Sequence, residues 1–599
     1  MATIRLGHFV TCAMAAVSTA AAAAEWTVSG LIREEIAVKM TGDQNENNWG
    51  GNAFNGVAVP NTFAKRVLGV DSTLTRPGSQ KEKPDLNMFA TRAELNLDGK
   101  LNENWAAHFK LRAFTDQLGR VESAYRDKNF FEQSYGASRS GGVLGVARKD
   151  WMLDLPIAYL DYSNGPVWLR MGNQQIAWGE ALFFRVADMA NGLDLRRHST
   201  LDVAAEEFSD KRVSAPALRA MWRATDSVQL EGFAQLFRPT VLPGENSPYN
   251  IIPAQFVVDQ KSGYDDVKDK VNFGLRMQGQ FDDVGVQLFA LRRNNPDGVI
   301  RWAKAQGAGA VGDSAFAGNS GVGVYSAQEW FRTASLTRLD GLGALETALN
   351  EFNTAPLGAT GLANVCGASG SAGTATQAGN IRVDSASAAC ILDGFFSGGD
   401  LRGWLVREYP RENVFGFGLN TVFNGEPDSF LDQLIARFEL SHTPNKKFTS
   451  PTLSRDYIEK DETTFAFIFE KYHKFSQTLP ATYMVFQWMH KSESDLFGRS
   501  LEGTRNKPGG APKGDDRGSN NVAFVLQQPT PSLEWRFDLA ALTDLKGGWF
   551  VQPGVKWKLN KSAQLDVYAN YFRSSNDGGD FAEGLDYARE VFVRGTWYF

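Results

Sequence analysis

The chain has 599 residues and a formal net charge of −6, so it lacks the basic excess that a nucleic-acid partner requires. Aromatic residues make up 12% of the chain, yet its mean hydropathy is mildly polar at −0.30. A wall of alternating lipid-facing and lumen-facing residues averages to such a value. After the leader, no run of roughly eighteen apolar residues indicates a membrane-spanning helix.

Residues 1–24 have the features of a secretory signal peptide. Arg5 supplies a positive charge, residues 9–24 form an alanine-rich apolar run, and Ala22 to Ala24 offer the small residues that a signal peptidase needs. The run is too short for an anchor helix, and a strand-like stretch follows it at once. We therefore expect cleavage after Ala24 and export of the chain.

From residue 25 onward, strand-like segments pair across short turns, and long polar segments separate the pairs. Apolar and polar residues alternate along each segment, as in strands with one face toward lipid and one toward a lumen. The predicted hairpins join 89–97 with 105–113, 155–162 with 167–174, 215–224 with 228–237, 271–280 with 284–293, 414–423 with 434–441, 463–472 with 482–490, 521–527 with 533–541, and 549–559 with 563–573.

A first strand at 25–38 and a last strand ending at Phe599 complete the set. The sequence thus predicts an all-β fold, in which residues 25–599 form an outer-membrane antiparallel β-barrel of about 18 strands. Without the weakest hairpin, 521–541, about 16 strands remain, which is also an even number. Phe599, preceded by further aromatic residues, resembles the signal that the bacterial barrel-assembly machinery reads. We expect the protein in the outer membrane of a Gram-negative bacterium.

Residues 300–408 depart most from a plain barrel. The stretches 303–323 and 355–379 are rich in glycine and alanine and are expected to be irregular. Between them, Ser326 and Glu329 fit a helix capping box. A helical face follows with Leu342, Leu345, Leu349 and Phe352. Because the insertion follows an upward strand, it lies outside the membrane, either as an external cap or as a plug that dips into the pore.

Two cysteines remain after the leader, Cys366 and Cys390. They lie in one Gly/Ala/Ser-rich stretch of a chain bound for an oxidising compartment, so we expect a disulfide between them. Closing a loop of this size stabilises the folded state by about 3 kcal/mol in the chain-entropy model.

No catalytic constellation is recognisable in the sequence. The five histidines of the mature chain stand in no triad or metal-ligand spacing: His108, His198, His442, His473 and His490. We therefore expect no enzyme activity, no metal site and no cofactor.

Basic side chains gather on the lumen-facing positions of the strands between residues 90 and 293. The predicted pore-lining residues are Arg92, Lys110, Arg112, Arg170, Arg219, Arg223 and Arg276. Inward acids are fewer there, namely Glu94, Asp161 and Glu231. Such a wall concentrates anions, unless its charges merely form cross-strand ion pairs that stiffen the lumen. Inward aromatics such as Tyr159 and Trp168 suit an amphipathic anion better than an inorganic ion.

Glu180 follows a Trp-Gly pair where a long segment begins. It is either a carboxylate at the channel mouth or a loop residue that binds an arginine and fixes the turn. The segment that follows, 181–212, is unusually apolar for a solvated loop. Such a segment can fold into the barrel and narrow it.

Several motifs also resemble a large proteobacterial family of exported proteins that is catalogued as a domain of unknown function. The motifs lie at 170–180 (a strand ending in Trp-Gly-Glu), 191–197, 237–240 and 408–412, and the resemblance spans most of the mature chain. Members of the family are thought to be outer-membrane barrels. The resemblance implies a fold and a location but no particular substrate.

These patterns lead to two functional hypotheses. The first is a passive outer-membrane channel for a small, anionic or amphipathic organic solute, with the inward basic residues as a selectivity ladder. The second is a barrel that moves hydrophobic or lipid-like compounds with an envelope transport partner. Outer-membrane lipid and the barrel-assembly machinery are partners in both.

Overall fold

The computed structural model describes residues 25–78, 83–136, 138–196, 211–318, 321–352, 359–371, 379–396, 399–427, 429–503, 518–575 and 579–599. The predicted signal peptide and His198 therefore lie outside the described residues. In the described part, eighteen antiparallel strands close into one barrel. They are β1 (Glu25–Lys39), β4 (Leu86–Lys100), β5 (Trp105–Asp116), β7 (Trp151–Asn164), β8 (Val167–Gln174), β9 (Ala215–Arg223), β10 (Val228–Leu236), β12 (Val271–Phe281), β13 (Val284–Asn294), β17 (Arg411–Phe423), β18 (Leu434–Phe448), β19 (Ile458–His473), β20 (Thr482–Lys491), β21 (Ser519–Pro529), β22 (Trp535–Asp544), β23 (Trp549–Lys558), β24 (Ala563–Arg573) and β25 (Glu590–Tyr598).

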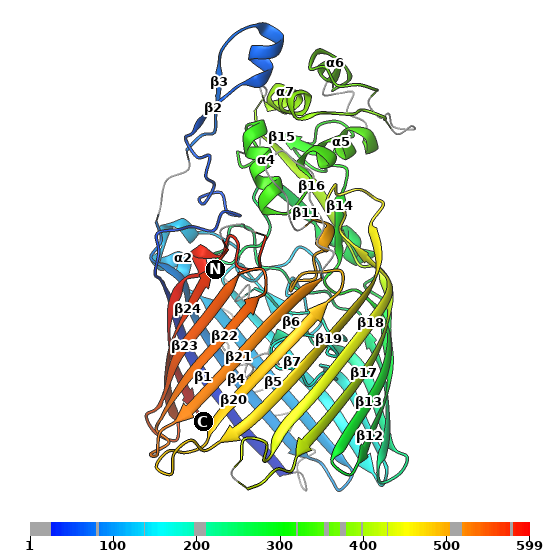
Figure 1. The fold of residues 1–599 in the computed structure, drawn as a ribbon, viewed down its shortest axis with the longest axis vertical. Coiled ribbons are helices and arrows are strands. Elements are labelled where there is room, and N and C mark those ends of the chain that lie inside the picture. Colours follow the sequence, from blue (N-terminus) through cyan, green and yellow to red (C-terminus); the bar gives the residue numbers. More distant parts are fainter. Residues whose placement is uncertain are drawn as a thin grey trace, which may run out of the picture.

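Each barrel strand pairs with its neighbour in sequence, and all the short turns lie at one end of the barrel (Figure 1). This confirms the predicted hairpins, including 521–541, which forms β21 and β22. The ring closes where β1 pairs with β25, from Leu31 opposite Tyr598 to Lys39 opposite Glu590. Phe599 extends this closure, because its backbone exchanges two hydrogen bonds with Gly30, at 2.9 and 3.1 Å.

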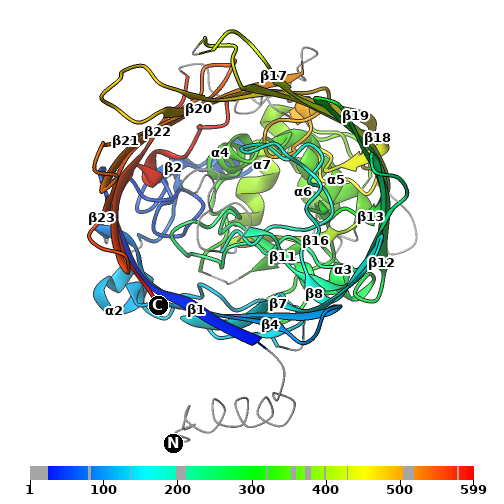
Figure 2. The same ribbon diagram turned by 90° about the horizontal axis from the view of Figure 1, so that it is seen from below.

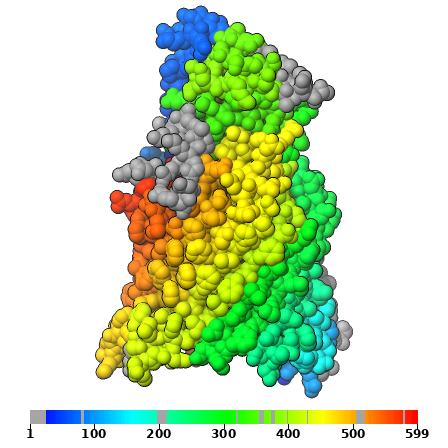
Figure 3. Space-filling view, turned by 45° about the vertical axis from the view of Figure 1, so that its right-hand side comes forward, coloured from blue at the N-terminus to red at the C-terminus, as the bar shows by residue number. Residues whose placement is uncertain are grey.

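The outer face of the barrel is apolar. Leu218 and Leu275 are 52% and 70% exposed, which is unfavourable in water and favourable against lipid. Aromatic pairs stand beside the short turns: Trp105 with Tyr162, Tyr472 with Tyr483, and Trp535 with Trp557. These pairs form an interfacial girdle, and long loops at the opposite end mark the extracellular side. Figure 3 shows the slanted wall from outside, with further structure stacked on it.

A separate body, which we call the cap, stands above the long-loop end of the barrel (Figure 1). Seen from below, its helices lie within the outline of the ring (Figure 2). Its sheet joins β16 (Leu401–Glu408) to β11 (Phe256–Asp259), β14 (Val299–Trp302) and β15 (Phe316–Gly318). Its helices are α4 (Ala327–Leu336), α5 (Gly341–Glu351), α6 (Ala359–Val365) and α7 (Ser385–Phe396). None of the described helices is long and apolar enough to cross a membrane.

Smaller elements decorate the connections between barrel strands. They are β2 (Ala58–Pro60), η1 (Ala64–Leu68), β3 (Thr73–Thr75), α2 (Leu118–Val121), η2 (Ser123–Tyr125), β6 (Gly145–Ala147), α3 (Gln260–Asp265), η5 (Leu501–Gly503) and η6 (Asp586–Ala588).

The cap has its own apolar core. Trp302 stacks on Trp330 with ring centroids 6.2 Å apart, and both are buried. Leu345 and Leu349 of α5 face this core, as their helical spacing predicts. The expectation that 355–379 is irregular is wrong for α6, because residues 359–365 are helical. Cys366, which follows α6, forms the predicted disulfide with Cys390 of α7.

Buried ion pairs join the cap to the rest of the chain. Ser326 caps α4 as predicted, while the carboxylate of Glu329 receives the buried Arg76 at 2.8 Å. Arg76 belongs to the arm between β1 and β4, so this pair ties the arm to α4. A second pair joins the cap to the barrel: Arg338, which follows α4, binds Asp495 of the loop between β20 and β21 at 3.0 Å.

Candidate functional site

One loop crosses the lumen of the barrel. We call residues 175–196, which follow β8, the crossing loop. The carboxylate of Glu439 on β18 accepts backbone N–H groups from Glu180, Ala181 and Ala187. The next anchor lies on β20, where the Gln487 side-chain oxygen accepts N–H groups of Leu182 and Phe183 at 3.2 and 3.1 Å. Because β18 lies six strands from β8 along the sheet, these contacts carry the loop across the lumen to the far wall.

Apolar contacts seat the crossing loop on that far wall. Phe184 and Val186 are 3% and 0% exposed. They belong to a cluster with lumen-facing residues of β19 to β25, among them Ile468, Val525 and Phe592. Burial of such side chains stabilises a docked loop by about 1.5–3 kcal/mol each. The first part of the predicted segment, residues 181–187, therefore lies inside the barrel against the far wall, while residues 197–210 of that segment lie outside the described residues.

The near end of the crossing loop is held by Trp178. Its indole Nε1 donates to Glu231 of β10 at 2.7 Å, and its ring lies against Phe233 and Phe289 at centroid distances of 5.0 and 5.9 Å. Gly274 makes room for it, because a Cβ there would lie 2.8 Å from the indole. The loop is therefore fixed at both sides of the lumen.

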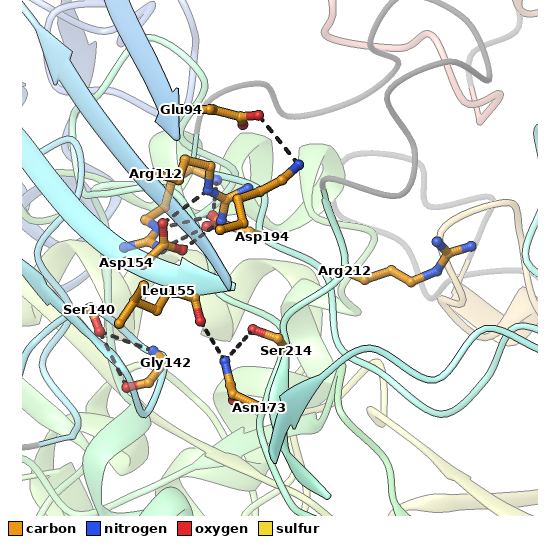
Figure 4. A network of polar contacts seen from close by, with 12 residues as sticks. Glu94, Arg112, Ser140, Gly142, Asp154, Leu155, Asn173, Asp194, Arg212 and Ser214 are labelled. Atoms are coloured by element: carbon orange, nitrogen blue, oxygen red, sulfur yellow. Dashed lines mark hydrogen bonds and ion pairs between the residues drawn. The ribbon is translucent and has the colours of Figure 1, made fainter. Parts of the chain in front are cut away.

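The predicted pore-lining basic residues face the lumen on β4 to β12, and six of them share four carboxylates. The pairs are Arg92 and Lys110 with Glu94, Arg112 with Asp154 at 2.6 Å, Arg170 with Asp161 at 2.7 Å, and Arg219 and Arg276 with Glu231, each at 2.5 Å. Figure 4 shows Glu94, Arg112 and Asp154 together, with Asp194 of the crossing loop beside them. Arg223, the seventh, is exposed at the short-turn end of β9. We call this side of the lumen the basic wall.

Aromatic rings cover part of the basic wall. The Arg170 guanidinium lies 3.8 Å from the ring centroid of Tyr159 and 5.0 Å from that of Trp168. Arg219 lies 5.3 Å from the same Trp168 ring. Such stacking holds each cation in place while part of its edge stays open to solute.

Glu180 lies deep in the lumen rather than at the outer end of its own strand. Its carboxylate pairs with Arg437 of β18 at 3.0 Å and receives the Asn420 amide at 3.2 and 3.3 Å. Asn420 and Arg437 oppose each other close to the short turn between β17 and β18. The chain turns into the lumen after β8. Glu180 therefore reaches the periplasmic half of the lumen, although β8 itself ends at the long-loop end of the barrel. Of the two interpretations of Glu180, the contact with Arg437 matches the second, a loop residue that binds an arginine.

Three of the four motifs that resemble a family, those that begin at 191, 237 and 408, meet at the long-loop ends of the strands. Phe237 packs against Tyr409 with ring centroids 5.2 Å apart, and the Leu193 N–H donates to Thr240 at 3.1 Å. The buried Arg407 donates to the carbonyls of Thr240, Pro296 and Asp297. These segments, far apart in sequence, thus form one structural joint between the barrel rim and the cap.

His108 lies 2.6 Å from Asp98 and 3.8 Å from Asp161, and its ring centroid is 5.2 Å from that of Tyr159. No group of three or more metal-ligating side chains occurs among the described residues.

In a closed antiparallel barrel with an apolar outer face and a polar lumen, every backbone N–H and C=O group within lipid has a hydrogen-bond partner. The fold therefore defines an outer-membrane β-barrel. The chain belongs to the family described as Protein of unknown function (DUF1302), whose model matches residues 4–590. No curated protein matches the sequence.

Solved structures match nearly the whole chain at low sequence identity. OccAB3 of Acinetobacter baumannii has a TM-score of 0.40 and 8% identity, covering 96% of this chain and 99% of that chain. OccK8 (OprE) of Pseudomonas aeruginosa has a TM-score of 0.40 and 7% identity, with coverages of 96% and 98%. OmpF of Salmonella typhi, solved with daunomycin, has a TM-score of 0.34 and 8% identity, with coverages of 96% and 97%.

Proposed function

We propose that this protein is an outer-membrane channel that passes a small, anionic or amphipathic organic solute along the basic wall, beside the crossing loop. The observation that carries the proposal is the unequal pairing on that wall, where six basic residues share four carboxylates. Excess positive charge along one wall of a lumen raises the local concentration of anions.

The stacked aromatic rings favour an organic anion over an inorganic one. Tyr159 and Trp168 present apolar faces next to Arg170 and Arg219. A solute with a carboxylate and an apolar body can use both kinds of contact at once.

The test is the reversal potential in a salt gradient for a variant with Arg170→Gln, Arg219→Gln and Arg223→Gln. The side chains of Arg170 and Arg219 are 21% and 17% exposed, so they face solvent in the lumen. Arg112 stays in place, because its side chain is 4% exposed and its removal would leave Asp154 without its partner. We expect selectivity to move away from anions.

A matched control is Arg499→Gln, which removes one cation from an extracellular loop. It should leave the reversal potential unchanged. An unchanged potential in the triple variant would mean that the basic residues only stiffen the barrel, and the proposal would lose its main support.

A second candidate, the movement of hydrophobic or lipid-like compounds with an envelope partner, is favoured by the apolar residues on the far wall. The crossing loop covers these residues, so an apolar path requires the loop to leave. Uptake of an apolar compound without ion current would favour this candidate. Neither candidate assigns a chemical reaction to the chain.

A further inference from the structure

Five amide side chains face the lumen beneath the crossing loop in two adjacent rows. We call Gln229, Gln278, Gln287, Gln280 and Asn420 the amide ladder. Along the first row, Gln229 opposes Gln278, which opposes Gln287. In the second row, Gln280 and Asn420 both oppose Gly285, one from each side. The register of four neighbouring strands therefore places these amides side by side.

The amide ladder lines a pocket with about 570 Å³ of space, part of which is open to the lumen. Glycines make this space. A Cβ on Gly285 would collide with the Asn420 amide, and one on Gly418 would lie 2.6 Å from the Gln287 side chain. Glu180 of the crossing loop also lines the pocket, so the site lies at the periplasmic face of that loop.

One atom of the ladder indicates that the pocket takes a ligand. Gln287 is 5% exposed, and its side-chain oxygen accepts no hydrogen bond from any residue in the described ranges. Buried acceptors without a donor are unfavourable, and a native site supplies the donor from a ligand or from water. The oxygen belongs to a residue that lines the pocket.

We propose that this pocket binds a neutral, hydroxyl-rich solute, a sugar or polyol. An amide group both donates and accepts hydrogen bonds, and a hydroxyl group does the same, so a row of amides matches a row of hydroxyls. Among the described residues that line the pocket, the charged ones are the acids Glu180 and Asp226, which disfavour an anion. Glu180 is itself paired with Arg437. The site thus selects a different solute from the one that the basic wall attracts.

The experiment measures binding of D-glucose and of sorbitol by isothermal titration calorimetry. The full-length mature protein is held in a detergent without a sugar headgroup, so that the detergent cannot compete. We expect both probes to bind the wild type, and Gln278→Leu with Gln287→Leu to weaken binding by roughly tenfold or more. The matched control is Gln527→Leu on β21, a lumen amide of the opposite wall, which should bind as the wild type does.

Two results would overturn the proposal: no binding of either probe to the wild type, or equal affinity in the double variant. Heat-modifiable migration in gels shows whether each variant is folded. If the double variant does not fold, Gln278→Leu alone carries the test, because Gln278 is the less buried of the two. Calorimetry in micelles needs no ion flow, so a channel without anion preference would still show this site. The failure of one proposal is therefore distinguishable from the failure of the other.

Discussion

Removal of the Glu439 carboxylate should release the crossing loop from the far wall. In the structure this carboxylate accepts three backbone N–H groups of the loop, and Gln487 accepts two more. The substitution Glu439→Ala deletes the first set and adds no apolar surface. It is therefore the cleanest single perturbation of loop docking.

The expected loss of docking free energy follows from the contacts that the substitution removes. A hydrogen bond contributes about 0.5–1.5 kcal/mol net, and water in the lumen can hydrate the freed N–H groups, so we take about 1 kcal/mol for each. Three such losses, about 3 kcal/mol, shift the docking equilibrium by about 150-fold. The apolar contacts of Phe184 and Val186 remain and contribute about 1.5–3 kcal/mol each. The single variant should therefore undock only part of the time.

Single-channel recording in planar bilayers measures how often the crossing loop undocks. We expect Glu439→Ala to switch between the wild-type conductance and a larger one, and the double variant with Phe184→Ala to stay in the larger state. The control is Glu470→Ala, which removes a lumen carboxylate that contacts Arg437 and Tyr483. If Glu439→Ala conducts as Glu470→Ala does, without a larger state, the crossing loop is not what narrows the pore.

Three further outcomes are expected. The ring of Phe599 lies against Gly30, where a Cβ would collide with it, so Gly30→Val and deletion of Phe599 should each impair barrel assembly; normal heat-modifiable migration in gels would contradict this. Cys366 and Cys390 should resist thiol labelling until reductant is added, and two reactive thiols without reductant would refute the bridge. Burial raises the pKa of the Asp495 carboxyl, but two neighbouring arginines outweigh burial and hold the pKa below its ordinary value. Because a lowered folded-state pKa gives stability that is lost as pH falls, protease sensitivity of the cap should rise below about pH 4, and replacement of Asp495 by Asn should remove that dependence.

The barrel could be predicted because its strands obey a local rule. Consecutive residues alone determine the alternation with a period of two and the short turns. The sequence therefore predicts even the weak hairpin at 521–541 correctly. The cap could not be predicted in the same way. Its sheet pairs β11, which belongs to the connection between β10 and β12, in parallel with β16, more than a hundred residues later. Nothing in either segment alone specifies that partner.

The lumen was only partly predictable, because side-chain pairing depends on register. The predicted inward acids do not include Asp154, because it lies just before the predicted strand 155–162. The pairing of β5 with β7 shifts between Lys110 and Arg112, next to Pro156, and this irregularity brings Asp154 to Arg112. The amide ladder carried no signal either, because neutral amides look like any polar residue until the registers of several strands are known.

The two sides of the lumen explain why a loop must cross it. On β19 to β25 the inner face carries large apolar residues such as Ile468, Val525 and Phe592, which would be unfavourable against water. A cover for this face has to come from inside the barrel, and the apolar segment after β8 supplies it. Once the loop is docked there, the basic wall remains as the charged side of the passage, and the amide ladder lies below it. The same contacts that bury the apolar wall therefore decide which surfaces a solute can meet.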